Sequence, residues 1–274
     1  MTTQIYKGTA LVTGASSGIG TVYADRLAKR GHDLILVARD QQRLEALAQR
    51  LRSEAGVKVD VLKADLGQKG DVQKVEQRIR TDPAISLLVN NAGIGPAGPL
   101  IGADIDLLDQ MIDVNITALN RLAVAAATVF AARGQGTIVN IASAVALVPE
   151  IFQGTYSGTK AFVLNLTLSL HGEAAKSGVR LQAVLPGYTR TEIFERAGHD
   201  IAQLDQTMVM EVDDLVDAAL VGLDQGEVIT IPSLPAAADW NAASAARLAL
   251  GPNLSKDKPA TRYRTAHLHT AAVG

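Results

Sequence analysis

The sequence predicts an α/β fold in which a parallel sheet of about seven strands is covered by helices on both faces. Short, β-branched apolar runs alternate along the chain with longer segments of helical period. The runs are apolar nearly throughout, as expected for strands buried on two sides. Their spacing leaves room for a crossover helix between successive strands. We therefore expect a doubly wound sandwich, and because no linker or repeat divides the chain, a single domain over residues 1–274.

Each strand and helix follows from one of these segments. The predicted strands are 9–13, 33–38, 57–62, 85–89, 137–141, 179–185 and 228–231. The predicted helices include 19–30, 41–54, 104–132, 156–176 and 212–223. Two regions interrupt the alternation, a strandless segment at about 188–211 and a tail at about 234–274. We expect the first to act as a substrate loop and the second to be variable.

Composition restricts the class of protein and its partners. The chain has 274 residues, 47% of them hydrophobic and 20% charged, which is typical of a globular domain. A net charge of −2 argues against nucleic acid as the main partner. The absence of cysteine excludes disulfides and cysteine-ligated zinc, and it fits a reducing cytoplasm. Residues 1–8 lack the apolar core of a signal peptide, and the apolar stretch 122–132 is too short to span a bilayer. We expect a soluble cytoplasmic protein with no membrane partner.

The first predicted strand runs directly into a glycine-rich turn that is followed by a helix. Glycines let the chain turn tightly and let its backbone approach a pyrophosphate, while the helix presents free N–H groups and its positive dipole end. The spacing is Gly-x-x-x-Gly-x-Gly rather than the commoner Gly-x-Gly-x-x-Gly. A tight turn without a ligand is the alternative. The predicted nucleotide contacts in this turn are Gly14, Ser16, Ser17, Gly18, Ile19 and Gly20.

The end of the second predicted strand bears on the choice of cofactor. Enzymes that prefer NAD often place an acidic residue there to bind the ribose 2′-hydroxyl. This strand ends instead in Ala38, which is followed by Arg39 and Asp40. Arg39 can pair with a 2′-phosphate through a forked, charge-assisted contact. We expect NADP(H) in preference to NAD(H). In the alternative, Arg39 faces solvent and a shifted register lets Asp40 serve NAD.

A tyrosine and a lysine four residues apart open a predicted helix. Tyr156 and Lys160 therefore lie on one helical face. An isolated tyrosine, with a pKa near 10, is a poor acid or base at neutral pH. A nearby ammonium stabilises the phenolate and lowers that pKa, which suits acid–base chemistry on an oxygen. Ser143 strengthens this interpretation because it follows a buried strand, at the edge where doubly wound sheets bind ligands.

With these motifs in order, the chain resembles the short-chain dehydrogenase/reductase family over about residues 9–191. The resemblance implies a Rossmann-type fold and an oxidoreductase that transfers hydride between a nicotinamide and a carbonyl or alcohol. The motifs that carry it are Thr13-Gly14-x-x-x-Gly18-x-Gly20, Asn90-Asn91-Ala92-Gly93, Asn115, Ser143, Tyr156-x-x-x-Lys160 and Pro186-Gly187.

The resemblance also implies a role for each residue of the catalytic set. Tyr156 would exchange the proton with the carbonyl oxygen, and Ser143 would hydrogen-bond that oxygen. Lys160 would tune Tyr156 and hold the nicotinamide ribose. Asn115 would lie at an irregularity in its long helix and hold a water that links Lys160 to solvent. An ordinary polar helix residue is the alternative for Asn115.

Further cofactor contacts follow from the same resemblance. Asp65 and Leu66 would contact the adenine, and a simple helix cap is the alternative for Asp65. Asn91 would support the central sheet as well as approach the adenosine ribose. The segment after the sixth strand would hold the nicotinamide, with a phosphate contact added at its end. The implied contacts are Asp65, Leu66, Asn91, Ala92, Gly93, Tyr156, Lys160, Pro186, Gly187, Thr189 and Thr191.

Loops beyond the strand ends are expected to select the substrate. The candidate segments are 95–100, 144–152, 188–210 and the tail around Trp240. They contribute Val145, Leu147, Ile151, Phe152, Phe194, Met208 and Met210. We expect a small to medium apolar or aromatic ketone or aldehyde as the substrate. The alternatives are a polyol dehydrogenase, a 3-oxoacyl thioester reductase or, from another class, an NADP(H)-binding redox sensor.

Members of the family that the chain resembles are usually dimers or tetramers, so we expect a homodimer or homotetramer. The helices 104–132 and 156–176 are the predicted shared surfaces. Their apolar candidates are Val124, Phe130, Phe162 and Leu166, which core packing explains equally well. We expect no metal, because His267-x-His269 has no further obvious ligand. The basic tail residues Lys256, Lys258, Arg262 and Arg264 are interpreted as solvated.

Overall fold

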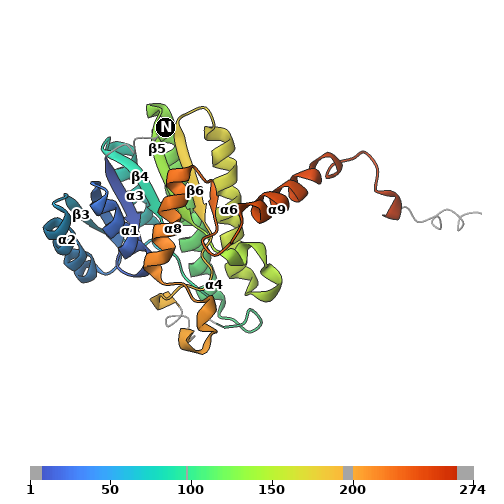
Figure 1. Cartoon of the computed structure of the whole chain (residues 1–274), viewed down its shortest axis with the longest axis horizontal. Coiled ribbons are helices and arrows are strands. Elements are labelled where there is room, and N and C mark those ends of the chain that lie inside the picture. Colours follow the sequence, from blue (N-terminus) through green and yellow to red (C-terminus); the bar gives the residue numbers. More distant parts are fainter. Residues whose placement is uncertain (1–7, 97, 194–199, 264–274) are drawn as a thin grey trace, which may run out of the picture. The chain divides into compact units, whose positions relative to one another are not determined.

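The computed structural model describes residues 8–96, 98–193 and 200–263, and its chain divides into two compact units, Met1–Ser233 and Leu234–Gly274. The first unit contains one sheet of seven parallel strands in the order β3-β2-β1-β4-β5-β6-β7 (Figure 1). The strands are β1 (Thr9–Thr13), β2 (Asp33–Ala38), β3 (Val59–Lys63), β4 (Ile85–Asn90), β5 (Gly136–Ile141), β6 (Val179–Val184) and β7 (Ile229–Thr230). The predicted doubly wound sheet is confirmed.

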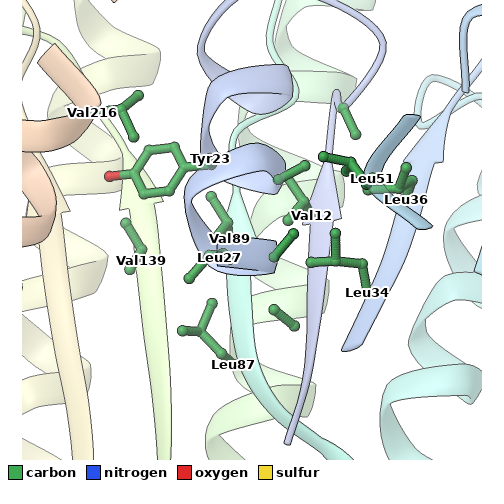
Figure 2. Close-up of a cluster of buried hydrophobic side chains, with 14 of the residues drawn as sticks. Val12, Tyr23, Leu27, Leu34, Leu36, Leu51, Leu87, Val89, Val139 and Val216 are labelled. Carbon is green, nitrogen blue, oxygen red and sulfur yellow. The ribbon is translucent and has the colours of Figure 1, made fainter. Parts of the chain in front are cut away.

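Helices cover both faces of the sheet because alternate strand residues point to opposite sides. One core cluster joins one face to three helices, and Figure 2 shows Tyr23 and Leu27 of α1 lying over Val12 and Val139. These helices are α1 (Gly18–Lys29), α2 (Gln41–Ala55) and α8 (Val212–Gln225). A second cluster joins the opposite face to α3 (Lys69–Thr81), α5 (Leu119–Arg133) and α6 (Gly154–Ala174).

Helix α3 lies in a segment for which we named no element. Its composition is polar, and only Val72, Val75 and Ile79 are buried. Their spacing of three and four residues is the minimum that forms an apolar stripe. A weak helical pattern is therefore enough when the stripe packs on a sheet.

The predicted helix 104–132 is interrupted. It consists of α4 (Ile105–Ile112), a π-helical turn η1 (Asp113–Ala118) and α5. This run, Ile105–Arg133, is the one described helix long and apolar enough to cross a membrane by length and composition alone. Half of its most apolar window is buried, and α5 belongs to the second core cluster. That packing is the usual behaviour of a core helix.

Two of the apolar candidates for a shared surface have different environments. Phe130 is fully buried in the core, where its ring leaves no room for a side chain at Gly136. Its assignment to a subunit surface is therefore wrong, and core packing accounts for it. Val124 on α5 is 40% exposed. The oligomeric state stays a prediction.

The second unit begins near the boundary expected for the tail. It contains a helix, α9 (Ala237–Ala249), in which no residue is buried, and Trp240 is half-buried. Lys256, Lys258 and Arg262 are exposed, as a solvated tail requires. The predicted surface positions Arg264, His267 and His269 lie outside the described residues. The single-domain organisation of residues 1–274 also stays a prediction.

Candidate active site

The site lies at the carboxyl ends of the strands, where the chain changes direction within the sheet. From β1 the chain continues to β2 and β3 on one side, then crosses to β4, β5 and β6 on the other. In an open parallel sheet such a switch point leaves a crevice between the diverging loops. A cleft of about 1390 Å³ occupies this position, and residues that follow the first six strands line it.

The glycine-rich turn has the backbone that a pyrophosphate requires. Gly14 and Gly18 adopt φ angles of +65° and +53°, which side chains disfavour. A Cβ at Gly14 would lie 2.7 Å from Asn91 Nδ2, and one at Gly20 would lie 2.3 Å from Gly14 O. Helix α1 begins at Gly18, so its free N–H groups lie at the turn. The turn therefore fits a dinucleotide, with Gly20 acting through close packing and not as a lining residue.

Two side chains hold the ends of β1 and β4 together beneath this turn. Thr13 Oγ1 accepts hydrogen bonds from Asn91 N at 2.9 Å and Ala92 N at 3.1 Å. Asn91 Nδ2 donates to Thr13 O at 2.9 Å and to Gly14 O at 3.2 Å. Asn91 borders the cleft, but its amide nitrogen is engaged by the backbone. The contacts of Asn91 thus match the role expected for it in supporting the central sheet.

Arg39 and Asp40, which follow β2, differ in their side-chain contacts. Asp40 caps α2 by accepting from Arg43 N at 3.0 Å, and Arg43 Nη1 contacts both carboxylate oxygens of Glu192 at 2.9 Å. Arg39 is exposed and lines the cleft, and within the described parts of the chain its side chain has no hydrogen-bond or ion-pair partner. Arg39 therefore presents an uncommitted guanidinium to the cleft, while Asp40 already has a structural role.

The residues after β3 line the cleft without capping a helix. Asp65 Oδ1 accepts from Gly67 N at 3.0 Å, and Asp65 N donates to Asp71 Oδ2 at 2.9 Å. The residue that precedes α3 is Gln68, so the helix-cap alternative for Asp65 is wrong. Asp65 instead closes the turn before the helix, and Leu66 is buried beside it.

Ser143, Tyr156 and Lys160 all line this cleft, as predicted. Lys160 Nζ lies 5.8 Å from the centre of the Tyr156 ring and donates to Ile141 O at 3.0 Å. Ser143 is buried after β5, and its Oγ donates to Pro186 O at 3.3 Å. These three side chains form one wall of the cleft. A single carbonyl oxygen bound in front of this wall could contact the hydroxyl groups of both Ser143 and Tyr156.

Burial controls the electrostatics of this wall. Although Tyr156 as a whole is half-buried, burial around its hydroxyl raises the pKa of Tyr156 to about 12, and a hydrogen bond with Ser143 opposes the rise. Burial lowers the pKa of Lys160 to about 8. We expected the lysine to lower the tyrosine pKa, and the structure gives the opposite direction. The reason is that desolvation disfavours both the phenolate and the ammonium.

Asn115 lies in the π-helical turn η1, at the irregularity that the resemblance implied. Its Oδ1 accepts from Ile94 N at 2.8 Å, and its Nδ2 donates to Ile94 O at 2.9 Å and to Thr159 Oγ1 at 3.1 Å. A Cβ at Gly93 would lie 3.3 Å from Asn115 Oδ1 and 3.6 Å from Lys160 Nζ. Asn115 thus joins the loop after β4 to α6 behind Lys160. Its role in holding a water stays a prediction.

The segment after β6 closes the other side of the cleft. Thr189 is buried, its Oγ1 donates to Gly187 O at 3.2 Å, and its backbone pairs with Met210. Thr191 lies against the glycine-rich turn, since a Cβ at Gly18 would approach Thr191 Cγ2 to 3.3 Å. This contact places a hydroxyl-bearing residue beside the predicted phosphate site.

Most of the residues predicted from the sequence meet at this cleft. Of the catalytic and cofactor-binding candidates, only Gly20 and Asn115 do not line it. Among the substrate candidates, Val145, Phe152 and Met208 line it, whereas Leu147, Ile151 and Met210 do not. Phe194 lies outside the described residues, and Trp240 belongs to the second unit.

Several lining residues were absent from the predicted set, among them Gln153 and Arg43. Gln153 borders the cleft, and its position three residues before Tyr156 at a helix start was a signal for it. Arg43 also lines the cleft, but only the structure reveals its contact with Glu192. The described residues contain no group of three or more histidine or acidic side chains that could hold a metal.

Comparison with protein families gives a match over residues 8–202 to the family described as short chain dehydrogenase. Among curated proteins, the chain is 36% identical over 191 residues to a very-long-chain 3-oxoacyl-CoA reductase of Anas platyrhynchos. That match covers 67% of this chain and 60% of the relative. The chain thus spans less than two thirds of the length of this reductase.

Two solved structures are similar over nearly the whole chain. A short-chain dehydrogenase from Sphingobium yanoikuyae in complex with NADPH is 51% identical, with a TM-score of 0.91 and coverage of 94% of this chain and 100% of the other. A bulky-bulky ketone specific alcohol dehydrogenase from Comamonas testosteroni is 45% identical, with a TM-score of 0.86 and coverage of 93% and 98%.

Replacing Gly20 by alanine tests the packing of the glycine-rich turn. The added Cβ would collide with Gly14 O and displace the backbone that faces the cleft. We expect affinity for NADPH and for NADH to fall together, by about tenfold or more. Binding can be followed by nicotinamide fluorescence. Gly70→Ala is the control, because nothing lies within 4 Å of its added Cβ. Unchanged affinity in Gly20→Ala would show that the turn does not carry the dinucleotide.

Proposed function

The chain belongs to the short-chain dehydrogenase family and is an oxidoreductase, and from that premise we propose that it reduces bulky apolar ketones with NADPH. The observation that carries this proposal is the gathering of Ser143, Tyr156 and Lys160 on one wall of the cleft that begins at the glycine-rich turn. The assignment as an oxidoreductase leaves the redox-sensor alternative without support.

The preference for NADPH is supported by the residues after β2. Arg39 is exposed and lines the cleft, where its guanidinium would pair with a 2′-phosphate by a charge-assisted contact, and Asp40 is engaged at the start of α2. The 51% identical structure from Sphingobium yanoikuyae is a complex with NADPH. The glycine-rich turn would hold the pyrophosphate, and the segment Pro186–Thr191 would hold the nicotinamide end.

The preference for a bulky apolar ketone is supported by the opposite end of the cleft. There the lining includes Val145, Val148, Phe152, Leu204 and Met208. The charged lining residues after β2 and β3 lie across β1 from this region, since the sheet order separates the two ends. The 45% identical structure is that of a bulky-bulky ketone specific alcohol dehydrogenase. Apolar side chains therefore line the cleft together with Ser143, Tyr156 and Lys160.

The proton chemistry follows from the pKa values of this wall. When bound, the nicotinamide supplies the hydride for the substrate carbon. Tyr156, whose pKa of about 12 keeps it protonated at neutral pH, donates its proton to the carbonyl oxygen. Ser143 donates a hydrogen bond to the same oxygen. Lys160, charged below its pKa of about 8, stabilises the phenolate that forms when Tyr156 gives up its proton.

A second candidate is the reduction of a 3-oxoacyl thioester. It is supported by the 36% identity to a very-long-chain 3-oxoacyl-CoA reductase, a match that covers 60% of that relative. Both candidates place a ketone oxygen before Tyr156 and Ser143. They differ in whether the substrate also carries a thioester group. Activity measured on ketones, 3-oxo esters, thioesters and polyols therefore distinguishes the two candidates from each other and from a polyol dehydrogenase.

Cofactor choice tests the role of Arg39. Removal of the guanidinium in Arg39→Ala should weaken NADPH affinity about 10- to 100-fold, because a charge-assisted contact with a phosphate is lost, and should change NADH affinity about twofold at most. Titration calorimetry with both nucleotides measures this. Lys69→Ala removes the same charge outside the cleft lining and should leave the NADPH-to-NADH ratio unaltered. Equal losses for both nucleotides in Arg39→Ala would refute the assignment.

The dependence of ketone reduction on pH tests the role of Lys160. Because Lys160 is protonated below its pKa of about 8, kcat/KM for reduction should be level below that pH. It should then fall about tenfold per pH unit above it. Tyr156 stays protonated throughout this range. In Lys160→Arg the side chain stays charged to higher pH. The fall in the kcat/KM that this variant retains should therefore begin at a higher pH. A fall that stays near pH 8 in this variant would assign it to another group.

A further inference from the structure

An ion pair joins two sides of the cleft. Arg43 lies in the first turn of α2, and its Nη1 contacts both carboxylate oxygens of Glu192, in the segment that follows β6, at 2.9 Å. Asp40 holds Arg43 in this position, because its Oδ1 accepts from Arg43 N at 3.0 Å and its Oδ2 lies 3.5 Å from Arg43 Nε. The pair therefore connects segments that are 149 residues apart in the sequence.

The sheet order shows how far this contact reaches. Strands β2 and β6 are separated by β1, β4 and β5. Neighbouring strands are about 4.8 Å apart, so the ends of β2 and β6 are about 19 Å apart. The segment after β6 therefore has to extend over the intervening strand ends to reach α2. Thr191 agrees with this course, since a Cβ at Gly18, in the turn after β1, would lie 3.3 Å from Thr191 Cγ2.

Arg43 and Glu192 lie at the rim of the cleft. Both residues line it, yet their side chains are 50% and 40% exposed. A side chain that faces the cleft and is also half-exposed has the cleft on one side and solvent on the other. The ion pair therefore stands between the cleft and solvent.

A dinucleotide held as proposed above would extend along the same interval. Its adenosine end would contact residues that follow β2 and β3, its pyrophosphate the turn after β1, and its nicotinamide residues that follow β6. We propose that Arg43 and Glu192 form a clasp that closes over the bound dinucleotide and slows its release. This inference rests on the proposed function, because it assumes that the cleft binds NADPH. It deepens that function by naming residues that set how long the cofactor stays bound.

The clasp has a different role from Arg39. The guanidinium of Arg43 is engaged by the carboxylates of Asp40 and Glu192, whereas Arg39, in the part of the chain that the structure describes, has no such partner. The 2′-phosphate is therefore left to Arg39. Because the clasp does not depend on that phosphate, it should act on NADPH and NADH alike.

The test measures how fast the cofactor leaves. Protein saturated with NADPH or with NADH is mixed in a stopped-flow instrument with an excess of the oxidised nucleotide, and the change in nicotinamide fluorescence gives the release rate. The variants are Glu192→Gln, Arg43→Gln and the double variant. Glu211→Gln is the control, because it removes an ion-pair partner of Arg190 in the same segment, and neither Glu211 nor Arg190 lines the cleft.

We expect each single variant to release both nucleotides about two- to fivefold faster than the wild type, as the loss of an exposed ion pair requires. The double variant should be no faster than either single variant, because the same contact is lost in all three. Glu211→Gln should release both nucleotides at the wild-type rate.

The two single variants also separate the clasp from a general effect of charge. Loss of a negative charge in Glu192→Gln would by itself hold an anionic cofactor longer, whereas loss of a positive charge in Arg43→Gln would release it sooner. Slower release from the first and faster release from the second would therefore overturn the inference and assign Arg43 to the cofactor phosphates.

The remaining outcomes distinguish this inference from the proposed function. Unchanged release in both single variants, from a wild-type protein that reduces a bulky ketone with NADPH, would overturn the clasp and leave the proposed function standing. Failure of the wild-type protein to bind either nucleotide would overturn the proposed function, and the clasp with it.

Discussion

The burial of the Lys160 ammonium is the constraint on which the rest of the site depends. Lys160 is 6% exposed, and its Nζ donates to the carbonyl of Ile141 at the end of β5. A buried charge is costly unless it is hydrogen-bonded, and the cost lowers its pKa. The surrounding structure holds it there, because Ile141 O accepts from Nζ and Asn115 ties the loop after β4 to α6. The acid–base chemistry proposed for Tyr156 depends on this arrangement.

The proposed dinucleotide site and the proposed acid–base site are neighbours because they lie at the same edge of the sheet. Parallel strands bring all their carboxyl ends together, so the glycine-rich turn after β1 and Ser143 after β5 border one cleft. Thr13 and Asn91 join β1 to β4 between them. The cofactor end and the substrate end are thus set by strand order, while loop residues decide which cofactor and which ketone fit.

Much of this was predictable from the sequence, because local patterns carry it. Continuous apolar runs gave the seven strands within about two residues at each end, and the spacing of Tyr156 and Lys160 placed both on one helical face. The π-helical turn at Asn115 came only from a family resemblance. The rise in the Tyr156 pKa, the burial of Phe130 and the Arg43–Glu192 contact depend on segments distant in sequence.

The most direct test of this account is a single-turnover measurement on the NADPH complexes of the wild-type protein and Tyr156→Phe. Each complex is mixed with a bulky aryl ketone, and the loss of nicotinamide absorbance is followed. We predict that the variant binds NADPH as the wild type does but reduces the ketone at least about a hundredfold more slowly, because the phenol that donates the proton is gone. Reduction at the wild-type rate by Tyr156→Phe would contradict the assignment of Tyr156 as the proton donor.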